Sequence, residues 1–252
     1  MATATLPAFL SARADVAARV ASELALPAKR DEAWRRTSLE GLEPDQYKAV
    51  PAQVKLIGEV PEGVVFAPLL DAAQAHNELL RTYLGTLLPM DLNKLTALQA
   101  AHLTGGVFLY VPPGVTVKEP LQVIYTTAAG EAQYVHTVVV AGANSSVTLL
   151  ERYAGEGDYL SVGAVELFAL DNARVRYGYL QNQSQDSWSF LFRRGRTARG
   201  AELDWVGGEF GGSLVRSEIV TTVEGEGSES NIKLVFGANE RQHIDIVANE
   251  TH

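Results

Sequence analysis

The sequence predicts a mainly β protein with an α/β N-terminal region, whose strands form a right-handed parallel β-helix-like stack. The first observation is a strand unit that returns through the second half of the chain at spacings of 28, 28 and 29 residues, opening at Val147, Val175, Leu203 and Ile232. Self-similarity at a fixed period indicates stacked supersecondary units that bury one continuous core.

The distribution of proline and glycine is the second observation. All ten prolines lie at or before Pro120, whereas 18 of the 22 glycines lie at or after Gly105. Proline removes a hydrogen-bond donor from a strand ladder, while glycine suits tight turns and bulges. A long proline-free stretch with regular glycines is therefore what an uninterrupted stack of strands requires.

The N-terminal region is predicted to hold three helices and two short strands. Apolar residues at three-and-four spacing predict the first two helices, which Pro27 and Pro89 close. The third ends before Gly105 and Gly106, because glycine commonly terminates helices. The expected helices are 6–26, 71–88 and 93–102, and the expected strands are 54–57 and 64–66.

From Gly106 onward the apolar residues alternate with a period of two, which is typical of strands. Pro112-Pro113-Gly114 predicts a type II turn between the first two of them, since glycine supplies the positive φ of its third position. The expected strands are 107–111, 121–127, 134–141, 147–153, 160–170, 173–181, 187–193, 201–206, 214–223, 231–236 and 243–248.

Antiparallel hairpins would give the same pattern, so a β-sandwich or jelly roll remains the alternative fold. Strands such as 138–140 and 167–170 are apolar throughout rather than alternating, which favours a stack with little solvent on its inner side, as in a β-helix. The change in composition near residue 104 predicts two domains. These are a helical and mixed N-terminal region over 1–104 and a β-helix core over 105–252.

Composition excludes several functional classes. The net charge of −9 argues against a nucleic-acid partner, which would need a basic stripe. There is no cysteine, so this stretch has no disulfide, thiol nucleophile or thiolate metal ligand. No run approaches the roughly 20 apolar residues of a membrane helix. We expect a cytoplasmic protein that binds neither nucleic acid nor membrane.

The search for chemistry yields no site that we assign. Gly155-Glu156-Gly157 and Gly225-Glu226-Gly227 lack the third glycine and the lysine of phosphate-binding loops, and are interpreted as turns. His243 and Asp245 share one face of a strand, with His252 seven residues beyond Asp245, but such a pattern more commonly comes from solvated strand residues near a rim than from a metal site. Catalytic, cofactor-binding and metal residues are therefore predicted as none.

Carboxylates also recur on the strands. Because arginines accompany them, we interpret them as a mixed-charge outer face rather than as the carboxylate pair of a glycosidase. The carboxylates are Glu151, Glu166, Glu202, Asp204, Glu209 and Glu218, and the arginines are Arg152, Arg174, Arg176, Arg193, Arg194 and Arg216.

Two stretches carry a family resemblance. Leu26-Pro27-Ala28-Lys29-Arg30-Asp31-Glu32-Ala33-Trp34-Arg35-Arg36-Thr37-Ser38-Leu39 resembles the early motif of the SufB/SufD iron–sulfur cluster assembly family. The stretch from Asp91 to Ala101, followed by Gly105 to Val115 and by Glu119-Pro120-Leu121, resembles that family's entry into its β-helix. The proline, basic and Trp element near the start looks like the SufD branch.

The resemblance implies a non-catalytic scaffold subunit of the Suf complex. It would pair with a SufB-like subunit and a SufC-like ATPase, and would dimerise with itself when isolated. It would hold no firmly bound cofactor, only a transient iron or iron–sulfur cluster at the level of the complex. Family members continue beyond the position of residue 252, so we expect the β-helix to be incomplete here and transfer no site residue. The alternatives are a carbohydrate-active β-helix enzyme and a cupin-like metal-binding protein.

Overall fold

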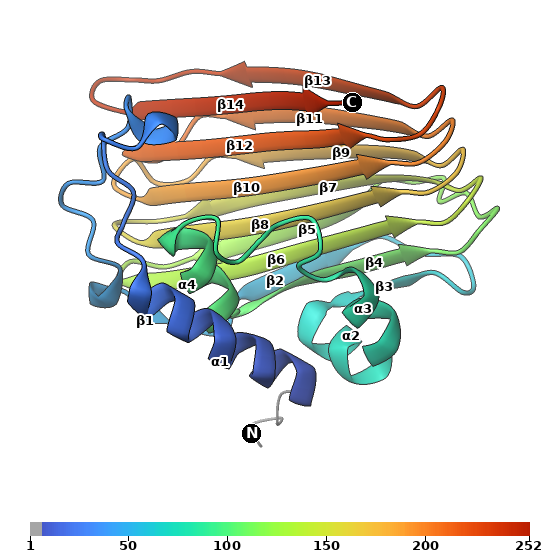
Figure 1. Cartoon of the computed structure of the whole chain (residues 1–252), viewed down its shortest axis with the longest axis horizontal. Helices are drawn as coiled ribbons and strands as arrows, with labels where there is room; N and C mark the ends of the chain where they lie inside the picture. The colour runs from blue at the N-terminus through green and yellow to red at the C-terminus, as the bar shows by residue number, and fades with distance from the viewer. Residues whose placement is uncertain (1–6) are drawn as a thin grey trace.

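The computed structural model describes residues 7–252, and its core is a stack of two β-sheets (Figure 1). Sheet A runs in the order β14 (His243–Thr251), β12 (Leu214–Val223), β10 (Trp188–Thr197), β8 (Leu160–Ala169), β6 (Glu131–Ala141), β4 (Gly105–Val111) and β3 (Val65–Pro68), and the short β1 (Lys48–Ala49) also pairs with β6. Sheet B runs in the order β13 (Glu229–Phe236), β11 (Glu202–Glu209), β9 (Arg174–Gln181), β7 (Ser146–Gly155), β5 (Leu121–Thr127) and β2 (Gln53–Ile57).

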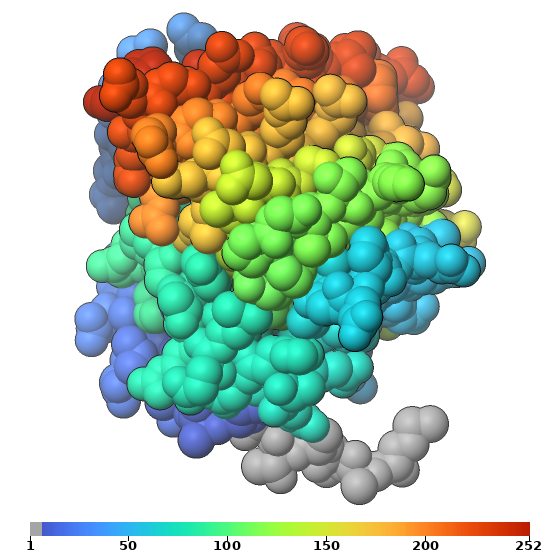
Figure 2. All heavy atoms as spheres, turned by 90° about the vertical axis from the view of Figure 1, so that its right-hand side faces the viewer, coloured from blue at the N-terminus to red at the C-terminus, as the bar shows by residue number. Residues whose placement is uncertain are grey.

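From β4 to β14 the chain passes alternately between the two sheets, and neighbouring strands within each sheet are parallel. Each pair of strands therefore forms one coil, and Figure 2 shows the coils layered in chain order along the stack. Among the strands of residues 7–252, only β2 and β3, from the N-terminal region, pair antiparallel with the stack. The predicted β-helix-like stack is confirmed, and the sandwich and jelly roll are not what forms.

The repeat predicted from the sequence holds for three of its four members. Val147 is aligned with Val175, and Val175 with Leu203, on neighbouring strands of sheet B. The fourth member was wrong, because Leu203 is aligned with Ser230, and Ile232 with Trp205. The last interval is thus 27 residues, not 29, because the polar Ser230 holds the position aligned with Leu203 and the apolar alternation begins only at Ile232.

The predicted type II turn is present at the entry to the stack. Gly114 has a φ of +75°, and the amide of Val115 donates to the carbonyl oxygen of Pro112 over 3.2 Å. The same loop position in later coils holds Asn144 and Asn172, whose φ angles of +58° and +55° are ones that asparagine tolerates better than most residues. The side-chain amide nitrogen of Asn172 donates to the side-chain oxygen of Asn144 over 3.2 Å, which joins the two turns.

On each strand every second side chain points into the space between the two sheets. Most of these inward side chains are apolar, so the interior is largely apolar. Valine and leucine fill most of it, and Trp205, Tyr125, Tyr153 and Tyr177 are its largest fully buried aromatic members. The branched and aromatic residues that favour strands thus also supply the apolar burial that holds the two sheets together.

The N-terminal region covers the outer face of sheet A (Figure 1). It contains α1 (Ala8–Glu23), α2 (Leu69–Ala75), α3 (Asn77–Tyr83) and α4 (Lys94–His102). Residue 6 of the first predicted helix lies outside the described residues. α4 begins at a capping box, in which the side chain of Asn93 accepts from the amides of Leu95 and Thr96. Within residues 7–252, no helix is both long and apolar enough to cross a membrane.

One helix prediction was wrong. The expected helix over 71–88 is broken at His76, which has φ −130° and ψ +39°, and ends at Tyr83. The amides of Gly85, Leu87 and Leu88, which would have continued the helix, donate instead to the carboxylate of Glu166. The buried carboxylate on sheet A thus takes the hydrogen bonds that these amides would otherwise make within a longer helix.

Candidate functional site

The strand carboxylates lie in three different environments, which corrects the prediction of one mixed-charge outer face. Glu202 and Asp204 do lie on the outside of sheet B, where they pair with Arg174 and Arg176 over 3.2 and 3.1 Å. Glu151 and Glu209 point into the interior, and Glu166 and Glu218 are buried beneath the N-terminal region. Period-two alternation fixes that neighbours face opposite ways, but it does not show which face is covered.

Glu151 lies at the centre of a cluster of hydroxyl groups between the two sheets. Its carboxylate accepts from the hydroxyls of Thr137 over 2.5 Å and Tyr153 over 2.6 Å, and from Tyr177. Tyr125 donates to it at the longer distance of 3.4 Å and also contacts Thr137 over 2.8 Å. These donors replace the water that the buried carboxylate has lost, and such replacement is what makes a charged group tolerable in a core.

A second buried charge lies next to this cluster. Arg193 comes from sheet A and Glu209 from sheet B, and both side chains are fully buried, with 3.5 Å between the guanidinium and the carboxylate. Ser217 bridges them, because it accepts from Arg193 over 2.7 Å and donates to Glu209 over 2.7 Å. The guanidinium also lies 3.5 Å from the ring centre of Tyr179, which is a cation–π contact.

We call these residues the interior polar centre: Tyr125, Thr137, Glu151, Tyr153, Tyr177, Tyr179, Arg193, Glu209 and Ser217. Among the described residues, Nε and Nη2 of Arg193 and Oε2 of Glu209 have no hydrogen-bond partner. Buried polar atoms are normally paired, so this guanidinium retains donor capacity for a small polar guest such as water. The centre thus holds one guanidinium and two carboxylates in one low-dielectric interior.

The electrostatics of the centre favour neutral tyrosines and a charged arginine. Burial raises the pKa of Tyr125, Tyr153 and Tyr177 well above 10.0, and the charge of Glu151 raises it further. Burial alone would lower the pKa of Arg193, but Tyr179 and Glu209 outweigh it and raise this pKa above its ordinary value. The tyrosines consequently act as hydrogen-bond donors to Glu151 over the whole ordinary pH range.

Glu166 forms a separate buried site on the outer face of sheet A. His136 contacts its carboxylate over 2.8 Å, and the amides of Gly85, Leu87 and Leu88 donate to it over 2.5, 2.6 and 3.0 Å. Burial would raise the pKa of Glu166, but the bonds from His136 and from the amides outweigh burial and lower it. This site anchors the segment after α3 to the stack.

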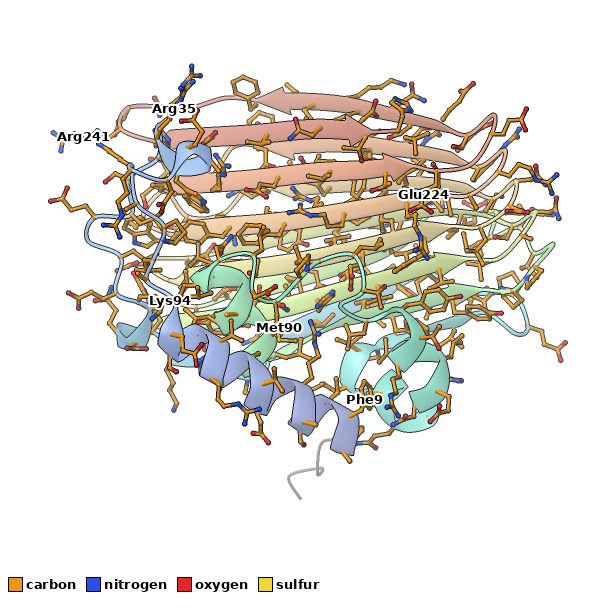
Figure 3. All side chains as sticks on the ribbon, viewed as in Figure 1. Phe9, Arg35, Met90, Lys94, Glu224 and Arg241 are labelled. Carbon is orange, nitrogen blue, oxygen red and sulfur yellow. The ribbon has the colours of Figure 1, made fainter. Side chains whose placement is uncertain are left out.

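The segment between α1 and β1, residues 24–47, runs along the stack as a strap and reaches its last strands (Figure 1). Trp34 from this strap lies 4.9 Å from the guanidinium of Arg216, measured to the ring centre, and 6.4 Å from the ring of Phe190. Arg216 pairs with Asp245 and, over 3.1 Å, with Glu218. Figure 3 shows the labelled Arg35 and Arg241 at this same end of the stack.

The two residues considered as metal ligands in the sequence are engaged by this strap. Asp245 accepts from Thr37 and pairs with Arg216, while His243 lies 3.3 Å from the hydroxyl of Thr37. His252 is an exposed residue after the end of β14. Across residues 7–252, no three His, Asp or Glu side chains are grouped so that they could hold a metal ion.

The interior polar centre was not predicted from the sequence. The signal was present, because Glu151, Glu209 and Arg193 each occupy inward positions when their strands are aligned by the apolar residues on either side. Because these side chains are charged, they were predicted to point outward, although the alternation of apolar residues placed them inward. The covered positions of Glu166 and Glu218 carried no local signal, because distant segments of the chain cover them.

Two family models match adjacent parts of the chain. Residues 124–252 match the family model described as SUF system FeS cluster assembly, SufBD core domain, and residues 51–123 match the SufBD protein N-terminal region. The core match begins within β5 and includes the whole interior polar centre.

Individual relatives agree with the family match. The chain is 34% identical over 197 residues to the iron–sulfur cluster assembly protein SufD of Bacillus subtilis. The aligned part covers 75% of this chain and 45% of that relative. The chain is 32% identical to a SufBD family protein of Guillardia theta (73% of this chain, 40% of the relative) and 26% identical to one of Staphylococcus saprophyticus (76% and 42%). The chain thus spans less than half the length of these relatives.

Its core match, its N-terminal match and its coiled two-sheet stack together show that the chain belongs to the SufB/SufD family of iron–sulfur cluster assembly proteins.

Proposed function

We propose that this chain is a non-catalytic scaffold subunit of a cytoplasmic Suf complex, in which it pairs with a SufB-like subunit and works with a SufC-like ATPase. The observation that carries the proposal is the match of residues 124–252 to the SufBD core domain. This part of the chain is the parallel stack itself, a shape that offers a long and rigid surface to partners. ATP hydrolysis would belong to the SufC-like partner.

The structure supports a scaffold role through the way the stack is braced. The interior polar centre ties sheet A to sheet B, and the strap ties the N-terminal region to the last strands. A frame braced inside and outside holds its surface in one shape, so that a partner binds without first ordering it. Iron or an iron–sulfur cluster would be held transiently at the level of the complex rather than firmly by this stretch.

The carbohydrate-active alternative requires two carboxylates that face a sugar across one groove. The six strand carboxylates instead lie in three environments, and each of them makes an ion pair or accepts a hydrogen bond from this chain. The geometry therefore favours the scaffold over a glycosidase. No observation favours a cupin-like metal enzyme, because Asp245 is already engaged with Arg216.

Co-expression with SufB-like and SufC-like proteins from the same source tests the proposal. The 252-residue chain is tagged, captured and analysed by size-exclusion chromatography with mass detection. A stable complex of the chain with both proteins is the expected result. If the chain retains neither protein, the Suf scaffold proposal is wrong.

A further inference from the structure

The outer face of sheet B has no helical cover among the described residues, in contrast to the outer face of sheet A (Figure 1). The parallel register places equivalent outward residues in rows that cross the strands. One row consists of Ile57, Gln122, Leu150, Gly178, Val206 and Lys233. The next consists of Lys55, Ile124, Arg152, Leu180, Gly208 and Val235. We call these two rows the sheet B groove.

The groove is apolar and hollow. Leu150, Leu180 and Val206 are 38%, 39% and 42% exposed, and none of them belongs to a buried core cluster. A cavity of about 410 Å³ opens between these side chains, where Gly178 contributes no side chain of its own. Contiguous exposed apolar surface of this kind marks sites of protein interaction more often than isolated exposed residues do.

The charge in the groove has one sign. Lys55, Arg152 and Lys233 lie within the two rows, which contain no carboxylate. All three are exposed, and the ion pairs formed within residues 7–252 include none of them. A basic groove on a chain with a net charge of −9 is a local reversal of the overall balance. Its electrostatic complement is an acidic surface.

We propose that the sheet B groove binds an acidic amphipathic helix of a partner protein. Neighbouring strands lie about 4.8 Å apart, and the pitch of a helix is about 5.4 Å. A helix laid across the strands therefore sets successive apolar anchors at i, i+3 or i+4, and i+7 into successive steps of the groove. Carboxylates flanking those anchors then face Lys55, Arg152 and Lys233.

Two other occupants fit the groove less well. A second copy of this chain, docked by the same face, would set these cations against each other with no carboxylate in either row. An anionic lipid surface favours protruding apolar side chains, whereas the groove is hollow, and the adjacent row carries the carboxylate of Asp204. The geometry of sheet B alone supports an acidic helix as the occupant, independently of the Suf assignment.

The test uses the whole chain and a designed peptide. The probe is a fluorescein-labelled 18-residue helix with leucines at the stated spacing and glutamates beside them. One control peptide has the same composition with the leucines spread around the helix, and the other replaces glutamate by lysine. Fluorescence anisotropy is expected to show binding about tenfold tighter for the acidic amphipathic peptide than for either control, a difference typical of a lost anchor.

Variants locate the binding. Leu180→Asp and the groove-filling Gly178→Val should each weaken binding of the acidic peptide about tenfold. Val16→Asp is the matched control, because Val16 is 42% exposed on α1, away from sheet B, and it should leave binding unchanged. Circular dichroism of each variant checks that the stack is folded.

Three results would overturn the proposal. One is equal binding of the three peptides, and another is binding that Leu180→Asp does not change. The third is occupation of the groove by something else, seen as self-association in sedimentation or as co-flotation with phosphatidylserine vesicles that Leu180→Asp abolishes.

Discussion

Thr37 and Asp245 are hydrogen-bonded although 208 residues separate them in the chain. The strap thus binds the stack at β14, the sixth strand from β4 along sheet A, and together with Trp34 it covers Arg216. The early motif that resembles the SufB/SufD family lies in this strap. Its Trp and Thr therefore have a physical role, which is to hold a buried arginine and carboxylate cluster against the outer face of sheet A.

Removal of Trp34 tests this role. Trp34→Ala should lower the free energy of unfolding by about 3 kcal/mol, because it deletes a buried aromatic side chain and uncovers Arg216. Urea denaturation measures the loss. Leu92→Ala is the control, since Leu92 is 47% exposed and a surface truncation should change the same quantity by less than about 0.5 kcal/mol. Equal effects of the two substitutions would contradict a bracing role for the strap.

The buried Arg193–Glu209 pair predicts a non-additive effect. Glu209→Ala should destabilise the chain by about 3–5 kcal/mol, since it leaves the guanidinium of Arg193 buried without a counter-charge. The double variant Arg193→Met with Glu209→Ala should recover a large part of this loss, because no unpaired charge remains. Chemical denaturation of the two single variants and the double variant gives the coupling. A double variant as unstable as the sum of the singles would show that the two groups do not act together.

The raised tyrosine pKa values predict loss of stability at alkaline pH. In the folded chain Tyr125, Tyr153 and Tyr177 have pKa values above the unfolded value near 10.0, so the folded state holds these protons more tightly. Their contribution is fully present below pH 10 and is lost as the pH rises toward the folded pKa values. In that window each of these tyrosines lowers the free energy of unfolding by about 1.4 kcal/mol for every pH unit of increase.

Tyr153→Phe isolates one of these contributions. The free energy of unfolding, followed by urea denaturation between pH 9 and pH 11, should fall less steeply in the variant than in the unchanged chain above pH 10, by about 1.4 kcal/mol per pH unit. Identical slopes would mean that Tyr153 is not held neutral by its surroundings.

Glu166 predicts the opposite pH dependence. Burial raises its pKa, but the bonds from His136, Gly85 and Leu87 prevail and lower it below the unfolded value of 4.5. Its stabilisation is therefore present above pH 4.5 and is lost as the pH falls through the folded pKa. Glu166→Gln should cost about 2 kcal/mol at pH 7, because charged acceptors make the stronger hydrogen bonds, and less in acid.

Hydrogen exchange gives a local measurement of the same contact. In Glu166→Gln the amides of Gly85, Leu87 and Leu88 should exchange faster, while those of β11 stay protected. Glu202→Gln is the control, because that carboxylate is exposed on sheet B and contacts Arg174 rather than a backbone amide. Unchanged exchange at all three amides would show that Glu166 does not anchor the segment.

The strands were predictable from the sequence because the signal that defines them is local. Alternation and the absence of proline after Pro120 marked all eleven strands of the stack within a few residues. The residues that the prediction misplaced depend on contacts between distant segments. The helix over 71–88 ends early because Glu166 accepts hydrogen bonds from the amides that would have continued it. The pairing of β11 with β13 sets Ser230 rather than Ile232 opposite Leu203, which the local apolar pattern did not show.

The candidate site was harder to predict for a related reason. Charge is normally an indicator of exposure, so Glu151, Arg193 and Glu209 were assigned to the surface. They are tolerated inside because hydroxyl groups from both sheets surround them, and the coil register brings those hydroxyls together. The strap contact between Thr37 and Asp245 left no trace in local periodicity, since neither residue has an unusual neighbourhood in the sequence.

Reconstitution of cluster assembly tests the central claim, that this chain is a non-catalytic scaffold. A SufB-like and SufC-like pair is loaded with iron and sulfide, with and without this chain, and bound iron, acid-labile sulfide and ATP hydrolysis are measured. A non-catalytic scaffold predicts more cluster per complex when the chain is present, with no ATP hydrolysis by the chain alone. Equal loading with and without the chain, or ATP hydrolysis by the chain itself, would contradict it.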